Sequence, residues 1–211
     1  MMRILFYGDS NTWGYNAMTG MRFPNRFTKQ IQKAYPEDEI LEEGLCGRTL
    51  CHSDPYCFEE RNGLKTVSMV LKTHEPVDLV VILLGTNDAK RVYATNALTS
   101  LEKGMDLFMH EAMDPDNFKR SLKAPRFLIV TPPKMHKDYA LCERTKIQFG
   151  QEGFDMLEYS DKPFRQIAKK WQADFLDLED LRAGKLDAIH LDEEGHCQMA
   201  EKLIQKLGEY R

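Results

Sequence analysis

The sequence predicts an α/β fold in which a parallel, doubly wound sheet is covered by helices on both faces. Two observations predict this class. Five apolar, strand-like segments alternate with amphipathic stretches along the chain, and this repeated order favours parallel strands joined by crossover helices. The central apolar segments are also continuous rather than alternating, which is typical of strands that are buried on both faces.

The expected strands are short apolar runs, the first of which stops abruptly at Gly8 and is followed by a polar cluster. In chain order they are RILFYG (3–8), DEILEEG (38–44), DLVVILLG (78–85), PRFLIVT (125–131) and ADFLDL (173–178).

An amphipathic stretch follows each expected strand, and we expect these stretches to be the helices that cover the sheet. They lie near residues 24–35, 62–74, 97–113, 153–172 and 195–209. Loops are expected at 14–25, 50–62 and 132–152. No Pro-, Gly- or Ser-rich stretch divides the 211 residues, so we expect one domain, residues 1–211.

Composition and charge exclude several classes of function. The formal net charge of −4 comes from acids and bases spread along the chain, so no basic face for nucleic acid is expected. The longest aliphatic run, Leu79 to Leu84, is far shorter than the roughly 20 residues that span a bilayer. The apolar stretch after Arg3 is too short for a signal peptide. We therefore expect a cytoplasmic protein that binds neither nucleic acid nor membrane.

The cysteines indicate reduced thiols. There are five, at positions 46, 51, 57, 142 and 197, an odd and sparse set for a disulfide framework. Three of them, with His52, lie in CGRTLCHSDPYC (46–57), but their spacing does not match the close Cys-x-x-Cys pairs of structural zinc sites. We expect no metal there, only buried or bystander thiols.

Polar clusters follow four of the five expected strands. GDSNTWG follows the first, GLCGRT the second, GTND the third and DAIH the fifth. Doubly wound sheets bind ligands beyond the carboxyl ends of their strands, where the strand order reverses, which in the order 2-1-3-4-5 lies between strands one and three. These clusters therefore predict a site at one end of the sheet.

Ser10 is the candidate nucleophile, because it is the hydroxyl just beyond the first strand. A hydroxyl needs a base to remove its proton, and His190, on the loop before the last helix, is the best candidate. Asp187, three residues earlier, could accept the other ring N–H, fix the tautomer and stabilise the imidazolium. An isolated histidine would more simply be a satisfied surface residue, so the hypothesis depends on the combination.

Acyl transfer also needs hydrogen-bond donors for the oxyanion, each worth about 3–4 kcal/mol. Asn87 offers a side-chain N–H after the third strand, and Gly47 offers a backbone N–H after the second. Taken alone, Asn87 could be a capping residue and Gly47 a turn residue with positive φ. Together with Ser10 and His190 they predict an oxyanion hole.

Four stretches carry a family resemblance: GDSNTWG, EEGLCGRT, LLGTND and DAIHLDEEGH resemble the four sequence blocks of the SGNH, or GDSL-type, serine hydrolases. The resemblance implies a flavodoxin-like three-layer α/β/α fold with a five-stranded parallel sheet of order 2-1-3-4-5, and ester cleavage without a cofactor. It implies that Ser10 is the nucleophile, that Asp187 and His190 complete the triad, and that Ser10, Gly47 and Asn87 form the oxyanion hole.

Within that family the chain looks most similar to the bacterial arylesterase and acyltransferase type, through GDSNTWGY, EEGLCGRT, DLVVILLGTNDAK and VTPP. This implies a small ester substrate, short acyl chains, transfer to water or an alcohol, and possible homo-oligomers. Glu42 and Glu43 stand where many members have an asparagine. An alanine at Gly47 is expected to cost nothing, because the donor there is a backbone group.

Trp13, Asp9 and Cys46 are the candidates for the substrate pocket. Trp13 could wall the acyl site or pack in the core, and Asp9 is expected mainly to make a turn hydrogen bond. Aromatic residues in the three loops predict an apolar, narrow entrance. These aromatic residues are Tyr15, Phe23, Tyr56, Phe58, Tyr139 and Phe149.

Two alternative functions use the same region. A metal-dependent phosphoesterase would use Asp9, Asn87, Asp88, His190 and His196 as ligands, although His196 is more simply structural. A non-catalytic module could instead bind an acylated ligand in the same pocket. The intact set of Ser10, Asn87, Asp187 and His190 favours the esterase.

Overall fold

A five-stranded parallel sheet forms the centre of the fold, in the order β2-β1-β3-β4-β5. The structure is a computed structural model that describes residues 1–93, 97–121 and 123–211. The strands are β1 (Arg3–Gly8), β2 (Glu39–Gly44), β3 (Leu79–Leu83), β4 (Arg126–Val130) and β5 (Asp174–Leu176). Each lies within the segment predicted for it, and the predicted order 2-1-3-4-5 is confirmed.

The register brings the carboxyl ends of the three strands nearest the expected site to one level. Gly8, the last residue of β1, pairs with Gly44 on one side and with Leu83 on the other. The segments that follow β1, β2 and β3 therefore leave the sheet side by side. This alignment lets residues distant in sequence form one site.

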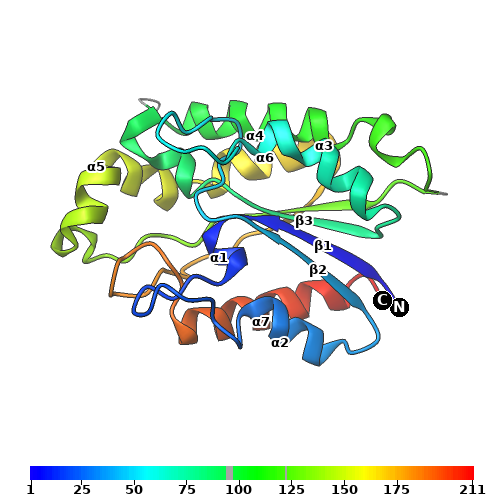
Figure 1. Ribbon diagram of the computed structural model, residues 1–211, viewed down its shortest axis with the longest axis horizontal. Coiled ribbons are helices and arrows are strands. Elements are labelled where there is room, and N and C mark those ends of the chain that lie inside the picture. Colours follow the sequence, from blue (N-terminus) through cyan, green and yellow to red (C-terminus); the bar gives the residue numbers. More distant parts are fainter. Residues whose placement is uncertain (94–96, 122) are drawn as a thin grey trace.

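Helices cover both faces of the sheet, which gives the three layers predicted for the fold (Figure 1). One face carries α3 (Gly63–His74), α4 (Leu98–Ala112) and α6 (Asp161–Trp171), and the other carries α2 (Phe27–Ala34) and α7 (Glu193–Gly208). Among the described residues, no helix is long and apolar enough to cross a membrane.

The strands supply alternate side chains to two separate cores. Leu5 and Tyr7 of β1 belong to the core under α3, α4 and α6, whereas Ile4 and Phe6 belong to the core against α2 and α7. Successive side chains of a strand point to opposite faces, and here both faces are buried under helices. The continuous apolar runs of the central strands follow from this burial.

The prediction of a single helix over 153–172 is wrong. The structure has two helices there, α5 (Glu143–Glu158) and α6, separated at Tyr159 and Ser160. Pro163 lies in the first turn of α6, where its missing N–H costs nothing; in a continuous helix its ring would clash with the carbonyl of Tyr159.

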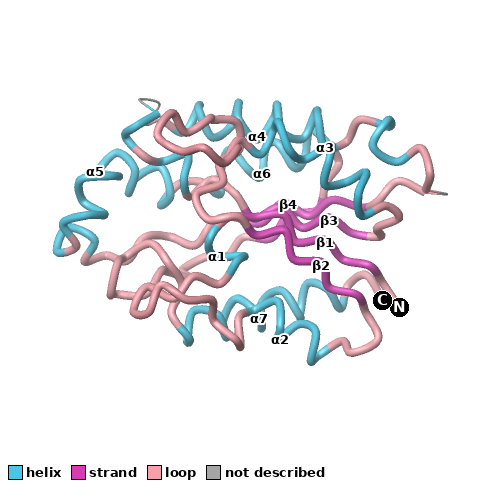
Figure 2. The backbone as a smooth tube through the Cα atoms, viewed as in Figure 1, coloured by secondary structure: helices cyan, strands magenta, loops and turns pink. Residues whose placement is uncertain are grey.

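The loop expected at 132–152 is also partly helical, because α5 begins at Glu143. Helical geometry is interrupted inside α5 at Gly150, so the apolar spacing carries no regular helical period through this segment. A second unpredicted element is the four-residue α1 (Ser10–Trp13). Both α1 and α5 lie at the carboxyl end of the strands (Figure 2).

His196 is a structural residue between α7 and α2. It is buried, and its Nδ1 accepts a hydrogen bond from the Phe27 backbone N–H at 3.4 Å. Its ring packs against the rings of Phe23 and Phe27, with centroids 5.1 and 6.0 Å away. Burial lowers the pKa of His196 to about 4, so the ring is neutral in the folded protein at neutral pH.

The His196→Asn variant tests this role, because asparagine does not titrate and still offers an acceptor to Phe27. The pKa of His196 is lower in the folded state, about 4, than its ordinary value of 6.5, so the unfolded state binds a proton first as the pH falls. Between pH 7 and 5 the wild-type free energy of unfolding should therefore fall by about 2 kcal/mol more than that of the variant. Urea denaturation measures both, and equal losses would contradict the prediction.

Candidate active site

Ser10 is held at the end of β1 by a short, capped turn of helix. Asp9 caps α1, its side chain accepting the Asn11 backbone N–H at 2.9 Å, and Ser10 is the first residue of the helix. The turn packs tightly against the end of β2, and only glycine fits at position 44, since a Cβ there would overlap the Trp13 backbone nitrogen. The strand therefore ends in polar residues that present the Ser10 side chain at the sheet edge.

A chain of hydrogen bonds links Ser10 to the loop between β5 and α7. The Ser10 hydroxyl donates to His190 Nε2 at 2.9 Å, although the two residues are 180 positions apart. His190 Nδ1 lies 2.5 Å from Asp187 Oδ2. The other Asp187 oxygen, Oδ1, accepts the backbone N–H groups of Ile189 and His190 at 3.1 and 3.0 Å. The structure thus brings together the serine, histidine and aspartate of the predicted triad.

Asp187 is ionised in this arrangement. Burial alone would raise its pKa, but the hydrogen bonds from the His190 ring, together with backbone N–H groups, outweigh burial and hold the pKa below its ordinary value. An ionised carboxylate fixes the His190 tautomer with the proton on Nδ1. His190 Nε2 is then an acceptor and faces the Ser10 hydroxyl as a base would.

Several residues that the sequence did not single out fix the loop of Asp187 and His190. Thr145 Oγ1 donates to the Asp187 carbonyl at 2.6 Å, and Asn11 Oδ1 accepts the Leu191 N–H at 2.9 Å. Ala188 has a φ of 62°, a conformation that costs about 1–2 kcal/mol for a residue with a Cβ. Surrounding contacts must hold that backbone in place, so the loop is preorganised.

The three residues predicted to form the oxyanion hole line one cavity. Ser10, Gly47 and Asn87 all line it, and neither the Ser10 nor the Gly47 N–H has a backbone acceptor among the described residues. Asn87 Nδ2 donates one hydrogen to the Arg48 carbonyl at 3.0 Å. Since the amide has a second N–H, it can both hold the loop after β2 and donate to a ligand.

The loop after β2, which carries Gly47, is fixed by two buried side chains. Arg48 Nη1 donates to the Gly8 carbonyl at 3.0 Å and to the Glu43 carbonyl. Both carboxylate oxygens of Asp88 accept the Leu50 N–H, at 2.9 and 3.1 Å. Asp88 therefore joins the segment after β3 to the loop after β2.

The expectation that alanine at position 47 costs nothing is wrong. Gly47 has a φ of 84°, which a residue with a Cβ adopts only with strain. An added Cβ would also lie 2.8 Å from Nη1 and 2.9 Å from Cδ of Arg61. Glycine is required here by backbone conformation and by the close approach of Arg61.

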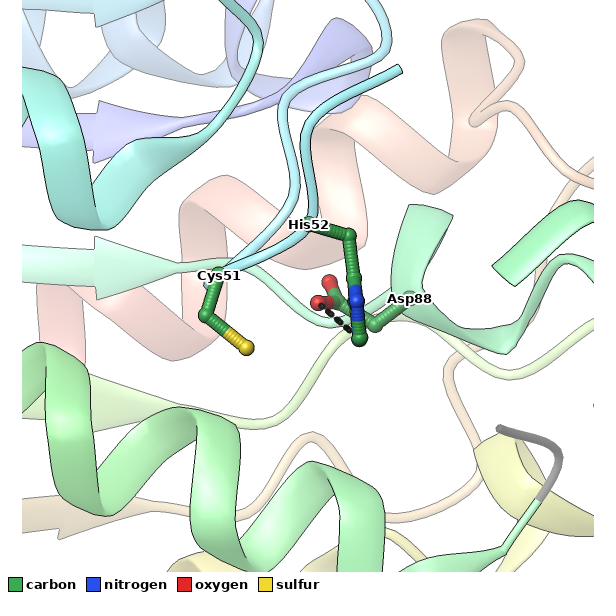
Figure 3. A group of neighbouring side chains, drawn as sticks. All are labelled: Cys51, His52 and Asp88. Atoms are coloured by element: carbon green, nitrogen blue, oxygen red, sulfur yellow. Dashed lines mark ion pairs between the residues drawn. The ribbon is translucent and has the colours of Figure 1, made fainter. Parts of the chain in front are cut away.

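A small polar cluster beside the site contains Cys51, His52 and Asp88 (Figure 3). Within the described residues it is the one group of three metal-ligand types whose donor atoms all lie within 4.8 Å of one another. Asp88 already accepts the Leu50 N–H, the His52 ring stacks on Tyr93, and burial, with Asp88 nearby, raises the pKa of Cys51 to about 11. We assign the cluster a structural role.

The ligand set of the alternative phosphoesterase is not brought together. Asp88 belongs to the cluster with Cys51, and His196 lies in the core between α7 and α2. Of the set, Asn87 and His190 line the cavity. The geometry therefore does not support the metal-dependent phosphoesterase.

The cavity next to Ser10 has a volume of about 600 Å³. Of the three expected pocket residues, Cys46 lines it and Trp13 and Asp9 do not. The Trp13 ring lies instead against Tyr15 and beneath Arg22, 6.4 and 5.6 Å away, and Tyr15 takes its expected place in the wall. The Asp9 side chain caps α1, and its burial raises its pKa.

The expectation that these aromatic residues line an apolar entrance holds for three of the six. Tyr15, Tyr56 and Phe149 line the cavity, but the other three aromatic residues lie elsewhere: Phe23 against His196, Phe58 fully exposed and Tyr139 stacked on Phe154. Charged residues replace them in the wall: Asp54, Arg61, Lys90, Arg91 and Arg144. Residue type along a loop does not indicate which side chains turn inward.

Known structures are similar to this chain over almost its whole length. The chain is similar to the crystal structure of a carbohydrate acetylesterase family member from Sinorhizobium meliloti, with 29% identity, a TM-score of 0.88 and coverage of 98% of this chain and 97% of that one. It is also similar to the aryl esterase of M. smegmatis, with 26% identity, a TM-score of 0.85 and 99% coverage of both chains. A sequence search of curated proteins found no match.

A family model also matches most of the chain. It describes the GDSL-like lipase/acylhydrolase family, and the match covers residues 6–197. That range includes Ser10, Gly47, Asn87, Asp187 and His190. The chain therefore belongs to the GDSL-like lipase/acylhydrolase family and is a carboxylic ester hydrolase.

Proposed function

We propose that the protein hydrolyses small carboxylic esters through an acyl-enzyme formed on Ser10. The observation that carries the proposal is the unbroken series of hydrogen bonds from Ser10 through His190 to Asp187, at 2.9 and 2.5 Å. It gives the hydroxyl a base and gives the base an ionised partner. Both are needed before a serine with an ordinary pKa attacks an ester.

In the first half of the reaction, His190 Nε2 takes the Ser10 proton as Oγ attacks the ester carbonyl. Asp187 stabilises the imidazolium that forms. The negative oxygen of the tetrahedral intermediate accepts hydrogen bonds from the Ser10 and Gly47 backbone N–H groups and from the Asn87 amide. His190 then gives its proton to the leaving alcohol oxygen, and Ser10 keeps the acyl group.

In the second half, His190 takes a proton from water as the water oxygen attacks the acyl carbonyl. His190 then gives this proton to Ser10 Oγ as the bond from Oγ to the acyl group breaks, and the carboxylic acid leaves. An alcohol that enters in place of water accepts the acyl group instead. A short acyl chain is supported by the similarity to a carbohydrate acetylesterase family member. The names of the similar proteins point to different alcohol parts, a carbohydrate in one and an aryl group in the other. The proposal therefore specifies the acyl group more closely than the leaving group.

The organisation of the protein completes the proposal. A single domain over residues 1–211 is supported by the family match to residues 6–197. A cytoplasmic location is supported by the five free cysteines, because thiols stay reduced there. A homo-oligomer is supported by the resemblance to the arylesterase type.

The Ser10→Ala variant tests the nucleophile. We expect kcat for p-nitrophenyl acetate to fall by roughly 10³-fold or more, and labelling by a fluorophosphonate probe to be lost. The matched control is Ser100→Ala, which removes a hydroxyl on α4, away from the cavity lining, and should change neither result. Full activity in Ser10→Ala, or a labelled residue other than Ser10, would contradict the proposal.

The Asn87→Ala variant tests the oxyanion hole. Loss of one donor should lower kcat by about 10²–10³-fold with little change in KM, because the donor acts mainly in the transition state. Asn87 also holds the Arg48 carbonyl, so thermal unfolding should be measured beside the kinetics. A change in stability with kcat unaltered would assign Asn87 to structure alone.

The Gly47→Ala variant tests the position of the second donor. Gly20→Ala is its matched control, because Gly20 also has positive φ, 71°, but nothing lies within 4 Å of an added Cβ. Both variants should lose about 1 kcal/mol of stability through backbone strain, and Gly47→Ala should lose more because Arg61 must shift away from the new Cβ. Only Gly47→Ala should also lose activity, by about tenfold or more as its donor moves. Equal activity in the two variants would show that Gly47 does not position a donor.

A further inference from the structure

The wall of the cavity carries more positive than negative charge. Four basic side chains line it, Arg61, Lys90, Arg91 and Arg144, against two carboxylates, Asp54 and Asp187. Both carboxylates are engaged: Asp187 with His190 at 2.5 Å, and Asp54 with Arg61 at 3.4 Å. The family chemistry at Ser10 does not use these cations, so they need another explanation.

Two of the four cations have carboxylate partners. Arg61 pairs with Asp54 and also with Glu59, the latter at 3.3 Å. Arg91 pairs with Glu152 at 3.0 Å. Their charges are therefore largely balanced within the protein.

The other two, Lys90 and Arg144, have no ion pair with any residue that the structure describes. Lys90 is half-buried and follows Asn87 by three residues, so it lies beside the proposed oxyanion hole. Arg144 is exposed on the first turn of α5 and lines the same cavity from a different segment of the chain. Their charges are available to a ligand.

The surroundings of Lys90 disfavour its charge. Burial is the largest effect and, with Arg61 and Arg144 nearby, lowers the pKa of Lys90. Asp54 and Asp9 act in the other direction but do not outweigh burial. A partly desolvated ammonium without a counter-ion is costly, and a bound anion would relieve that cost.

We propose that the cavity binds an ester that carries a negatively charged group, which Lys90 and Arg144 hold while the ester carbonyl lies at Ser10. The proposal rests on the ester hydrolysis proposed above and specifies its substrate class. A carboxylate is the simplest such group, and it could belong to the acyl part or to the alcohol part of the ester. Charge-assisted hydrogen bonds from the two cations would orient the substrate as well as bind it.

Two pairs of synthetic esters test the proposal and distinguish the two parts. The alcohol pair is 4-acetoxybenzoate and its neutral amide, 4-acetoxybenzamide. The acyl pair is the monophenyl ester of adipic acid and its neutral amide. In the wild-type protein we expect kcat/KM to be about tenfold higher for the anionic member of at least one pair, and we expect added salt to reduce this preference.

Variants then assign the preference to residues. In Lys90→Gln the ratio of kcat/KM for the anionic and neutral esters should fall about tenfold, and Lys90→Arg should restore most of it. Arg144→Gln, an exposed change that does not threaten folding, should lower the same ratio. The matched control is Lys169→Gln, which removes one charge from an exposed position of α6 and should leave the ratio as in wild type.

The possible failures are distinguishable. If the wild-type protein hydrolyses the neutral esters and shows no preference in either pair, the substrate class is wrong and ester hydrolysis stands. A preference that survives in both Lys90→Gln and Arg144→Gln would also overturn the proposal. If the wild-type protein hydrolyses no ester of either pair, the proposed function itself fails, and the substrate class with it.

Discussion

The hydrogen bond between Ser10 and His190 is the contact on which the rest of the site depends. It joins the first strand to a loop 180 residues later in the chain. Two features of the fold make it possible: β1 lies at the centre of the sheet, and the chain returns from the edge strand β5 over the carboxyl ends before α7 begins. A parallel sheet places all of these ends at one edge. The histidine needs only a fixed loop to meet the serine.

That loop is fixed by neighbours rather than by its own secondary structure. Thr145 and Asn11 bind its backbone, and Ala188 is held in a conformation that it would not adopt alone. On the opposite side, Arg48 and Asp88 fix the loop that carries Gly47. The groups that we propose to react are thus short side chains or backbone N–H groups on anchored turns. In that mechanism little reorganisation would be needed when charge develops on the substrate.

Four basic side chains add to the cavity wall a charge that the predicted apolar entrance did not include. Lys90 lies beside Asn87, so any negative group that it attracts would lie close to the reacting carbonyl. His196, in contrast, does not line the cavity. It is buried against the rings of Phe23 and Phe27, and this burial lowers its pKa to about 4. A titratable group contributes to chemistry here only where it reaches the cavity.

The sequence by itself determined the class of fold, the five strands and the residues at the sheet edge, because apolar runs and the polar clusters after them are local patterns. It also identified Ser10, Asp187 and His190 as a set. Only the tertiary structure decided which loop residues form the wall: Trp13 turns away, Tyr15 replaces it, and Lys90 and Arg144 face inward. The break before Pro163 and the conformation of Gly47 were likewise decided there. The physical reason is that the direction of a side chain in a loop depends on the residues that pack against the loop. These residues are distant in the sequence, and no periodic pattern in the loop indicates them.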